Sequence, residues 1–474
     1  MINDPAELDP AGPEPIELAP ALLERMAAVR AAALRTLDSD EPVYGVNTGM
    51  GNLSKVRLTE ADQRAHQRNL LLGRAVGGPP WLPPDESRAV LIARLKTFLT
   101  GDAAVSVDLI HQLVALINSP YTPAIPAEGA GSAGEIIPLA HAAGPLVGIG
   151  WLQAGSELQT AEGFLPALEL GPKEGIALLA GTPGTAGRAA LAARKASRLA
   201  DHLTAVAAGA IAVVGANRDP YQPSAARGDD VLAVEFARLR ELAGPEPEPR
   251  SLQAPVSFRV AGHVNAHVRR TLQQLDDAVE RAFTGVSDSP AYLEGDFVGT
   301  AGFHGIDLAA YCDHLTAALA HAAEVSTARL HRLLDPSVTG LTAQLACEPG
   351  PQAGLVAVHK RAVATTHQLR RLTLPTAIST AETSNGQEDV QTFSWEAVGN
   401  LAEAIRLTRE TTACELLAVR QAFALSAGPI PPGLRDLIQA VDDVVPPIDA
   451  DRPFGEDLTR LLTTVLQLSP ATGA

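Results

Sequence analysis

The chain has 474 residues, 46% hydrophobic and only 4% aromatic, so a large core and more than one folding region are expected. Its formal net charge is −17, and it contains no cluster of lysine and arginine of the kind that binding to nucleic acid needs. The longest apolar run, Ala205 to Ala216, is too short to span a bilayer, and the acidic, proline-rich start is unlike a signal peptide. We therefore expect a soluble, cytoplasmic protein with neither nucleic acid nor a membrane as partner.

Helical patterns and glycine-rich loops alternate in the first part of the chain. One amphipathic helix is expected within residues 1–40, and a Gly/Asn/Thr-rich loop follows from Val43 to Leu58. Two further helices are expected, from Asp85 to about Thr100 and from the capping residue Ser106 to Asn118. A glycine-rich loop at 128–135 then leads into another helix.

Long apolar stripes fill the second half of the chain. Apolar residues recur every three or four positions across 264–283, 308–322 and 394–425, whereas hardly any segment alternates as a strand would. The pattern predicts an all-α fold, an elongated bundle of long helices with a smaller, loop-rich N-terminal region. Because such stripes exceed what one chain can cover, we also expect a homo-oligomer.

The same patterns divide the chain into three expected regions. Residues 1–185 are the N-terminal region, residues 186–425 the central long-helix bundle, and residues 426–474 a short C-terminal helical region. The three cysteines are far apart and odd in number, so we expect small buried or half-buried apolar residues rather than a disulfide framework or a metal site.

Four separated segments carry a family resemblance. They read, in chain order, Tyr44-Gly45-Val46-Asn47-Thr48-Gly49 with Gly51; Gly131-Ser132-Ala133-Gly134-Glu135 with Pro138-Leu139-Ala140-His141; Lys173-Glu174-Gly175 with Gly181-Thr182; and Gln387-Glu388-Asp389 after Asn385. In order and spacing they resemble the histidine and phenylalanine ammonia-lyases over roughly residues 40 to 425. The resemblance implies amine elimination from an amino acid, and a homotetramer whose sites are each assembled from several subunits.

One position in the second segment departs from the family. Members of the family cyclise an Ala-Ser-Gly triad into a methylidene-imidazolone, an electrophile whose methylene arises when the central serine loses its hydroxyl. Here the triad reads Ser132-Ala133-Gly134, so the central residue has no hydroxyl to lose. A register shifted by one residue would centre on Ser132, but Ala133 would then supply the attacking nitrogen at a bend that favours glycine. We therefore expect no prosthetic group or other cofactor, and the shifted register is the less favoured alternative.

Three residues are catalytic candidates, and the resemblance supplies the first two. Tyr44 matches a mobile-loop tyrosine that removes the β-proton of the substrate; a core tyrosine that closes a turn is the alternative. Glu388 matches the glutamate of histidine lyases and suits an imidazole or ammonium group. Lys360, on the preceding long helix, is either a base or a charge that neutralises Glu388.

Five residues are candidates for substrate binding. Arg259 matches an arginine that grips the substrate carboxylate with paired, charge-assisted hydrogen bonds, and Gln253 lies in the same segment. Phe303 and Gln387 lie in segments that match the family near its site. Arg74 stands where the family places a residue that selects the substrate side chain. An arginine there favours an anionic or strongly polar substrate, unless it is a solvated helix charge.

Three site positions have drifted from the family pattern, and they leave the reaction open. The triad centre is Ala133, Val256 replaces a tyrosine, and Ala180 replaces an asparagine. Elimination without the electrophile is feasible where the amine is already a good leaving group, as a quaternary ammonium is, or where a neighbouring carbonyl or carboxylate acidifies the β-proton. An ergothioneine-cleaving lyase of the same fold group resembles the first case, and the aspartase/fumarase group resembles the second.

We predict such an elimination, or the reverse addition, on an amino-acid-like substrate, either histidine-derived or of betaine type. Retention of Tyr44, Arg259 and the Gln387-Glu388 pair supports this prediction. The alternative is a catalytically inactive homologue that acts as a binding or assembly subunit, which the three drifted positions support. Ordinary histidine ammonia-lyase activity is a third hypothesis.

Overall fold

The computed structural model describes residues 1–39, 41–131, 133–155, 157–246, 248, 251–378, 381–426 and 428–468. These residues form two compact units, each assembled from three stretches of the chain. Unit 1 comprises Met1–Ala192, Leu275–Cys312 and Pro375–Gly399, and unit 2 comprises Ala193–Gln274, Asp313–Leu374 and Asn400–Ala474. The three regions expected along the chain remain a prediction.

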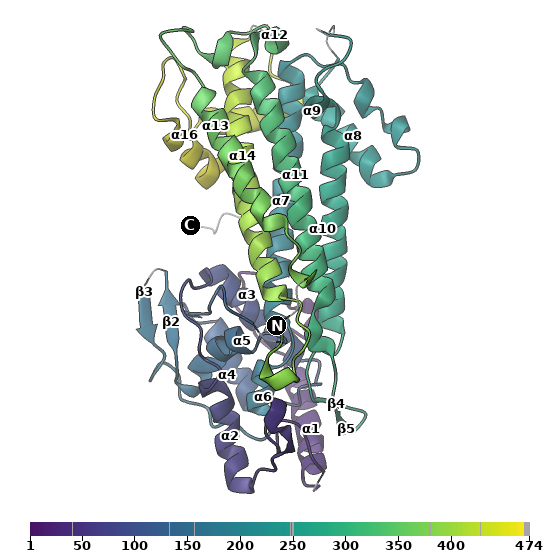
Figure 1. Ribbon diagram of the computed structural model, residues 1–474, viewed down its shortest axis with the longest axis vertical. Coiled ribbons are helices and arrows are strands. Elements are labelled where there is room, and N and C mark those ends of the chain that lie inside the picture. The colour runs from purple at the N-terminus through teal and green to yellow at the C-terminus, as the bar shows by residue number, and fades with distance from the viewer. Residues whose placement is uncertain are drawn as a thin grey trace. The chain divides into compact units, whose positions relative to one another are not determined.

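Helices dominate the described chain, so the predicted all-α class is confirmed (Figure 1). The four longest are α7 (Pro183–Val213), α10 (Ala261–Thr284), α11 (Ile306–Leu333) and α14 (Ser394–Leu425). The last three enclose the three predicted apolar stripes. The sequence did not predict α7 as one helix, because alanine recurs on all of its faces and leaves no distinct stripe. Within the described residues, no helix combines the length and the apolarity that crossing a membrane requires.

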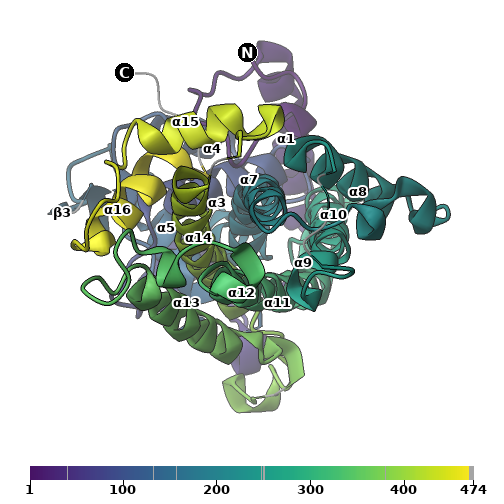
Figure 2. The same cartoon turned by 90° about the horizontal axis from the view of Figure 1, so that it is seen from above.

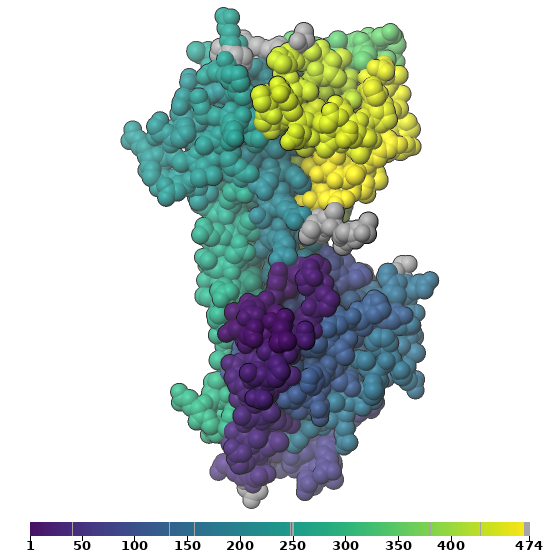
Figure 3. Space-filling view, turned by 180° about the vertical axis from the view of Figure 1, so that it is seen from behind, coloured from purple at the N-terminus to yellow at the C-terminus, as the bar shows by residue number. Residues whose placement is uncertain are grey.

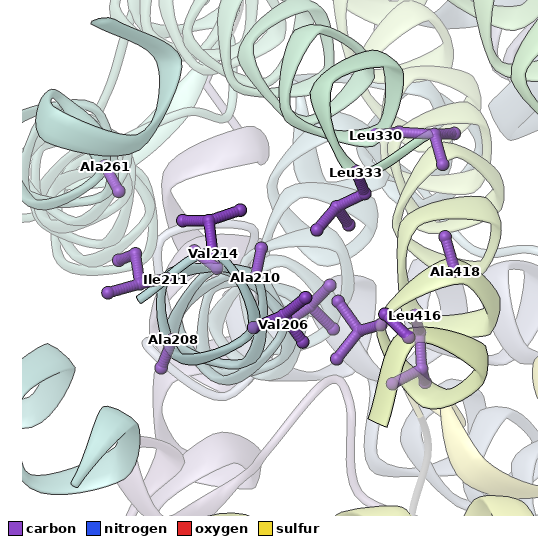
Figure 4. Close-up of a cluster of buried hydrophobic side chains, with 14 of the residues drawn as sticks. Val206, Ala208, Ala210, Ile211, Val214, Ala261, Leu330, Leu333, Leu416 and Ala418 are labelled. Carbon is purple, nitrogen blue, oxygen red and sulfur yellow. The ribbon is translucent and has the colours of Figure 1, made fainter. Parts of the chain in front are cut away.

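The core of unit 2 lies between its long helices. Seen end-on, α7 lies among α10, α11 and α14 (Figure 2). Figure 4 shows Val206 and Ile211 of α7 in one cluster with Leu333 of α11 and Leu416 of α14, and each of them is at most 1% exposed. Burying one such aliphatic side chain contributes about 1.5–3 kcal/mol.

The helices that lie wholly within unit 2 are shorter. They are α8 (Asp230–Ala243), α9 (Val256–Arg259), α12 (Pro336–Thr339), α13 (Val356–Leu369), α15 (Arg435–Asp442) and α16 (Phe454–Arg460).

The helices of unit 1 begin at local sequence signals. They are α1 (Pro20–Leu37), α2 (Glu60–Leu72), α3 (Pro84–Phe98), α4 (Val107–Ile117), α5 (Ile136–Ala143) and α6 (Glu174–Leu179). Ser106 caps α4 as predicted, because its hydroxyl oxygen accepts a hydrogen bond from the Leu109 amide at 3.2 Å. Thr59 caps α2 in the same way, with the Asp62 amide as donor at 3.2 Å.

The core of unit 1 is built around α3, and the N-terminal residues close over it. Leu91, Leu95 and Phe98, from the stripe predicted for this helix, are at most 3% exposed. Asn118, which follows α4, exchanges two hydrogen bonds of 2.8 Å with the backbone of Ile16. Figure 3 shows the N-terminal residues, in purple, beside the blue segments of the same unit.

Two small antiparallel sheets also belong to unit 1. Strands β1 (Thr122–Pro123), β2 (Trp151–Ala154) and β3 (Glu157–Thr160) pair in that order, with Leu152 opposite Gln159. Strand β4 (Ala291–Leu293) pairs with β5 (Asp296–Val298). Strands this short do not show an alternating pattern, so the sequence did not predict them.

Candidate active site

The loop that carries Tyr44 is clamped to α6. Gly45 has φ +68°, and a Cβ there would lie 2.3 Å from Cδ1 of Ile176, so the position requires glycine. The buried side chain of Gln67 donates a hydrogen bond to the Gly45 carbonyl (3.1 Å) and accepts one from the Gly175 amide (2.9 Å). One amide side chain of α2 thereby joins the first and third family segments.

Tyr44 is placed by the turn that follows it. Its hydroxyl oxygen accepts a hydrogen bond from the Gly51 amide at 2.7 Å, and the residue is 37% exposed. Asn47 fixes the rest of the loop, since its Nδ2 donates to the Glu41 carbonyl (2.8 Å) and its Oδ1 accepts from the Val43 amide (2.7 Å). The phenol oxygen is therefore positioned and reachable, and its own proton is not used in the bond to Gly51.

Arg74 follows α2 and is half-buried. Its Nη1 donates to the Leu70 carbonyl (3.3 Å) and its Nη2 lies 3.8 Å from Sδ of Met50. Its Nε is buried and has no hydrogen-bond partner among the described residues. Burial lowers the pKa of Arg74, and the charges of Tyr44 and Glu388 act to raise it. The first and fourth family segments thus act electrostatically on this guanidinium.

His66 is a polar residue at this site that the sequence reasoning missed. It lies on α2, and its Nε2 is buried without a hydrogen-bond partner among the described residues. Burial and the nearby charge of Arg74 both lower the pKa of His66, so the imidazole is neutral at pH 7. Only its position on the helix that precedes Arg74 could have pointed to it, because His66 belongs to none of the four matching segments.

The triad loop is attached to Glu388 through Ala133. The Ala133 amide donates to Oε2 of Glu388 at 2.9 Å, although 255 positions separate the two residues. Ser132 lies outside the described residues, and Gly134 has φ +78°. A methylidene-imidazolone on this triad needs a leaving oxygen on the central side chain, and Ala133 carries only a methyl group. The residues at the three positions therefore do not fit this prosthetic group.

Glu388 is held by neutral donors on its own loop. Thr383 Oγ1 donates to Oε2 at 3.0 Å, and Ser384 Oγ donates to Oε1 at 3.2 Å. The backbone groups of Thr383 and Glu388 also bond to each other in both directions. Between them, Ser384, Asn385 and Gly386 are all left-handed, with φ of 54°, 53° and 83°. That conformation costs an ordinary residue such as Ser384 about 1–2 kcal/mol, whereas asparagine and glycine adopt it readily.

Glu135 anchors the other end of the triad loop. Its carboxylate is fully buried and accepts hydrogen bonds from the amides of Gly184 (2.8 Å) and Thr185 (2.7 Å), in the first turn of α7. Burial raises the pKa of Glu135 to about 7, although the bonds from Thr185 and Gly184 and the charge of Arg94 act to lower it. This carboxyl joins the triad loop to a helix N-terminus.

The third family segment is structural. Nζ of the buried Lys173 lies 3.0 and 2.9 Å from the two carboxylate oxygens of Asp288. Burial lowers the pKa of Lys173, and the charge of Asp288 opposes that effect. Its neighbour Glu174 accepts hydrogen bonds from the amides of Ser106 (2.8 Å) and Gly171 (2.7 Å). These two charged residues stabilise the start of α6.

Two further candidates lie near these loops. Phe303 is half-buried, and a Cβ built on Gly134 would lie 3.7 Å from its Cβ, so the residue is a neighbour of the triad loop. Gln387 is exposed, and its amide donates to the Ser384 carbonyl at 3.3 Å. Within the described part of the chain, no group of three or more His, Cys, Asp or Glu side chains is arranged to hold a metal ion.

The remaining candidates belong to unit 2. Arg259 is half-buried at the end of α9, and its Nε donates to the Ala254 carbonyl at 2.9 Å. Gln253 and Lys360 are exposed. Unit 1 therefore contains the candidates of the first, second and fourth segments together with Arg74 and Phe303, whereas unit 2 contains Gln253, Arg259 and Lys360. The roles of all these residues remain predictions.

A helical bundle with these four segments defines a class of enzymes, the carbon–nitrogen lyases that act on amino acids. The sequence matches the aromatic amino acid lyase family over residues 7–443, and the chain belongs to that family. Lyase-type elimination on an amino acid is the chemistry that this membership supports.

Individual relatives extend over nearly the whole chain. The histidine ammonia-lyase of Deinococcus radiodurans is 30% identical over 465 residues, which cover 94% of this chain and 89% of the relative. The histidine ammonia-lyase of Anaeromyxobacter sp. strain K is 31% identical over 479 residues, covering 94% and 93%. The ergothioneine-degrading enzyme ergothionase of Treponema denticola, solved in complex with desmethyl-ergothioneine sulfonic acid, shares the fold with a TM-score of 0.89 and 22% identity, covering 97% and 96%.

Proposed function

We propose that this protein catalyses β-elimination, or the reverse addition, on an amino-acid-like substrate without a methylidene-imidazolone. The proposal rests on the centre of the triad. Ala133 has a methyl side chain there, and its amide donates a hydrogen bond to Glu388 at 2.9 Å. The hydroxyl whose loss creates the electrophile is missing there. Ordinary side chains must then perform the reaction.

Elimination without the methylidene-imidazolone requires a substrate whose amine is a good leaving group or whose β-proton is acidic. Ammonia leaves poorly from a carbon whose neighbour bears a weakly acidic proton, and the ring normally compensates for this in the family. A quaternary ammonium leaves readily, so we propose a histidine-derived or betaine-type substrate. In the elimination a base removes the β-proton, the C–H electron pair forms the carbon–carbon double bond, and the C–N bond breaks with its electrons on the departing amine.

Tyr44 is the proposed base, because the Gly51 amide holds its oxygen and the residue is exposed to a ligand. We propose that Glu388 positions the cationic part of the substrate, and that Lys360 is the alternative base. Arg74, Arg259, Gln253, Phe303 and Gln387 are the proposed binding residues. We also propose that the enzyme is a homotetramer, as in the prediction from the resemblance.

A catalytically inactive homologue with a binding or assembly role is the second candidate function. The drift at Ala133, Val256 and Ala180 favours it, because each of these residues has lost a polar side chain that the family pattern has. The hydrogen bonds that fix Tyr44 and Glu388 favour an enzyme instead, since an assembly surface does not need them.

Two measurements test the proposal. Intact-mass spectrometry of the purified protein should give the mass of the unmodified chain, whereas loss of two waters would show a matured ring and overturn the proposal. Ultraviolet absorbance should then reveal a conjugated acid formed from histidine betaine and not from free histidine. Production of urocanate from histidine would establish ordinary histidine ammonia-lyase activity, and inertness toward histidine, its betaine, tyrosine and aspartate-like compounds would favour the inactive homologue.

A further inference from the structure

Arg74 is a half-buried cation without a counter-ion in the described structure. Its polar contacts are the Leu70 carbonyl at 3.3 Å and the Met50 sulfur at 3.8 Å, and its Nε has no partner among the described residues. A guanidinium presents five N–H donors and stays charged, so these contacts use only part of its capacity. Charged groups removed from water are normally paired. Arg74 is thus ready to receive an anion.

Glu388 is the complementary anion. Its carboxylate oxygens accept bonds from Ala133 N, Thr383 Oγ1 and Ser384 Oγ, which are all neutral donors. No ion pair to Glu388 occurs among the residues that the structure describes. A carboxylate offers about four lone-pair sites, so it retains capacity for a cation.

The two charges act on each other without forming an ion pair. The loops next to them are in contact: Met50, whose sulfur lies 3.8 Å from Nη2 of Arg74, precedes Gly51, and a Cβ built on Gly51 would lie 3.8 Å from Oγ of Ser384, which donates to Glu388. The charge of Glu388 accordingly acts to raise the pKa of Arg74, although burial lowers it. Each has its own contact, since Arg74 donates to the Leu70 carbonyl and Glu388 accepts from the Ala133 amide. A ligand with a single charge would satisfy only one of them.

We infer that Arg74 and Glu388 form a cradle for a zwitterion, in which Arg74 binds the carboxylate of the ligand and Glu388 binds its ammonium group. This inference deepens the proposed function and rests on it for the class of substrate. Arginine suits the task because its planar fork forms two parallel hydrogen bonds to a carboxylate. The arrangement assigns the carboxylate to a residue of unit 1, whereas the family resemblance assigns it to Arg259.

His66 is consistent with this assignment. A second cation beside Arg74 would compete for the same anion, but burial and Arg74 itself lower the pKa of His66 and keep the imidazole neutral. Its buried, unpartnered Nε2 is then available for a hydrogen bond to the bound ligand.

Paired ligands and variants test which arginine receives the carboxylate. Isothermal titration calorimetry would measure the binding of L-histidine betaine and of its methyl ester, which lacks the negative charge. The wild-type protein would be compared with Arg74→Gln, Arg259→Gln and the control Arg68→Gln, which changes an exposed residue of α2. We expect the ester to bind roughly 10- to 100-fold more weakly than the acid to the wild type. That ratio should fall to near one in Arg74→Gln and persist in both other variants.

Glu388 is tested with an analogue that lacks the amine. Imidazole-propionate should bind more weakly than histidine betaine to the wild type by a similar factor, and Glu388→Gln should remove that difference. Circular dichroism checks that each variant is folded, and Arg74→Lys should restore part of the preference for the acid over the ester.

The inference is overturned if the preference for the acid survives in Arg74→Gln and disappears in Arg259→Gln. It is also overturned if the wild type binds no zwitterion at millimolar concentration. These experiments measure ligand binding alone, so their outcome is independent of whether the protein catalyses the proposed elimination. If the preference for the acid disappears in Arg74→Gln but no product is ever formed, the enzymatic proposal is refuted and the zwitterion site is supported.

Discussion

The buried carboxyl of Glu135 predicts an unusual dependence of stability on pH. Replacing Glu135 with Gln removes the ionisable group and keeps its shape. In the wild type, each carboxylate oxygen accepts an amide from the first turn of α7, Gly184 at 2.8 Å and Thr185 at 2.7 Å. The glutamine would present an NH₂ group to one of these donors, much as the protonated carboxyl presents its O–H, and this difference does not vary with pH. The ionisation of Glu135 adds a second effect that varies with pH.

The sign of the second effect follows from the direction of the pKa change. Burial raises the pKa of Glu135 from 4.5 to about 7, so the folded protein binds a proton more tightly than the unfolded chain. The resulting stability is fully present below pH 4.5 and is lost as the pH rises to about 7. At 1.36 kcal/mol per pKa unit, the loss amounts to about 3 kcal/mol.

Urea denaturation of both proteins between pH 4.5 and 8 provides the assay. The free energy of unfolding of the wild type, relative to Glu135→Gln, should fall by about 3 kcal/mol up to pH 7 and then stay level. Glu128→Gln, an exposed change on the same loop, controls for the loss of one acidic group. A relative stability that stays flat or rises with pH would show that the helix N-terminus keeps this carboxylate ionised, and the reasoning would be refuted.

Three further predictions concern the loops and the core. Ala133→Ser returns a hydroxyl to the triad centre, and intact-mass spectrometry should detect loss of two waters in a fraction of the protein; an unmodified mass would mean that the loop itself prevents cyclisation. Gln67→Ala should leave the Gly45 carbonyl and the Gly175 amide without their hydrogen-bond partner and lower the free energy of unfolding by about 1–3 kcal/mol. Hydrogen exchange should become faster in residues 45–51 and not in α4, and unchanged exchange would show that Gln67 does not hold the loop. Leu333→Ala should lower the free energy of unfolding in urea by about 2–5 kcal/mol, and a loss below 1 kcal/mol would show that this core collapses around the gap.

Much of the secondary structure was predictable from local pattern. The stripe at 394–425 coincides with α14, and Ser106 caps α4 through its own hydroxyl, because both signals depend on residues a few positions apart. The pattern was insufficient for α7, whose alanines do not distinguish one face from another. It was also insufficient for strands of two to four residues.

The sequence likewise predicted some features of the candidate site and missed others. The motifs identified Tyr44 and Glu388 as candidates, but not the hydrogen bond that joins Glu388 to Ala133, nor that Nε of Arg74 lacks a partner among the described residues. His66 carried no motif at all. Its interest arises from burial beside a guanidinium, and burial is a property of the packed chain.

The sequence by itself determined the helical class, the family resemblance and the absence of an oxygen on the central triad side chain. Periodicity, motif order and covalent composition are all properties of the linear chain and do not depend on how it packs. Only the tertiary structure decided which polar groups meet and which lack partners. It placed the Ala133 amide on Glu388 across 255 positions and set Glu135 at the N-terminus of α7. Pairing, burial and the resulting pKa values depend on distances in space, and spacing along a chain does not specify those distances.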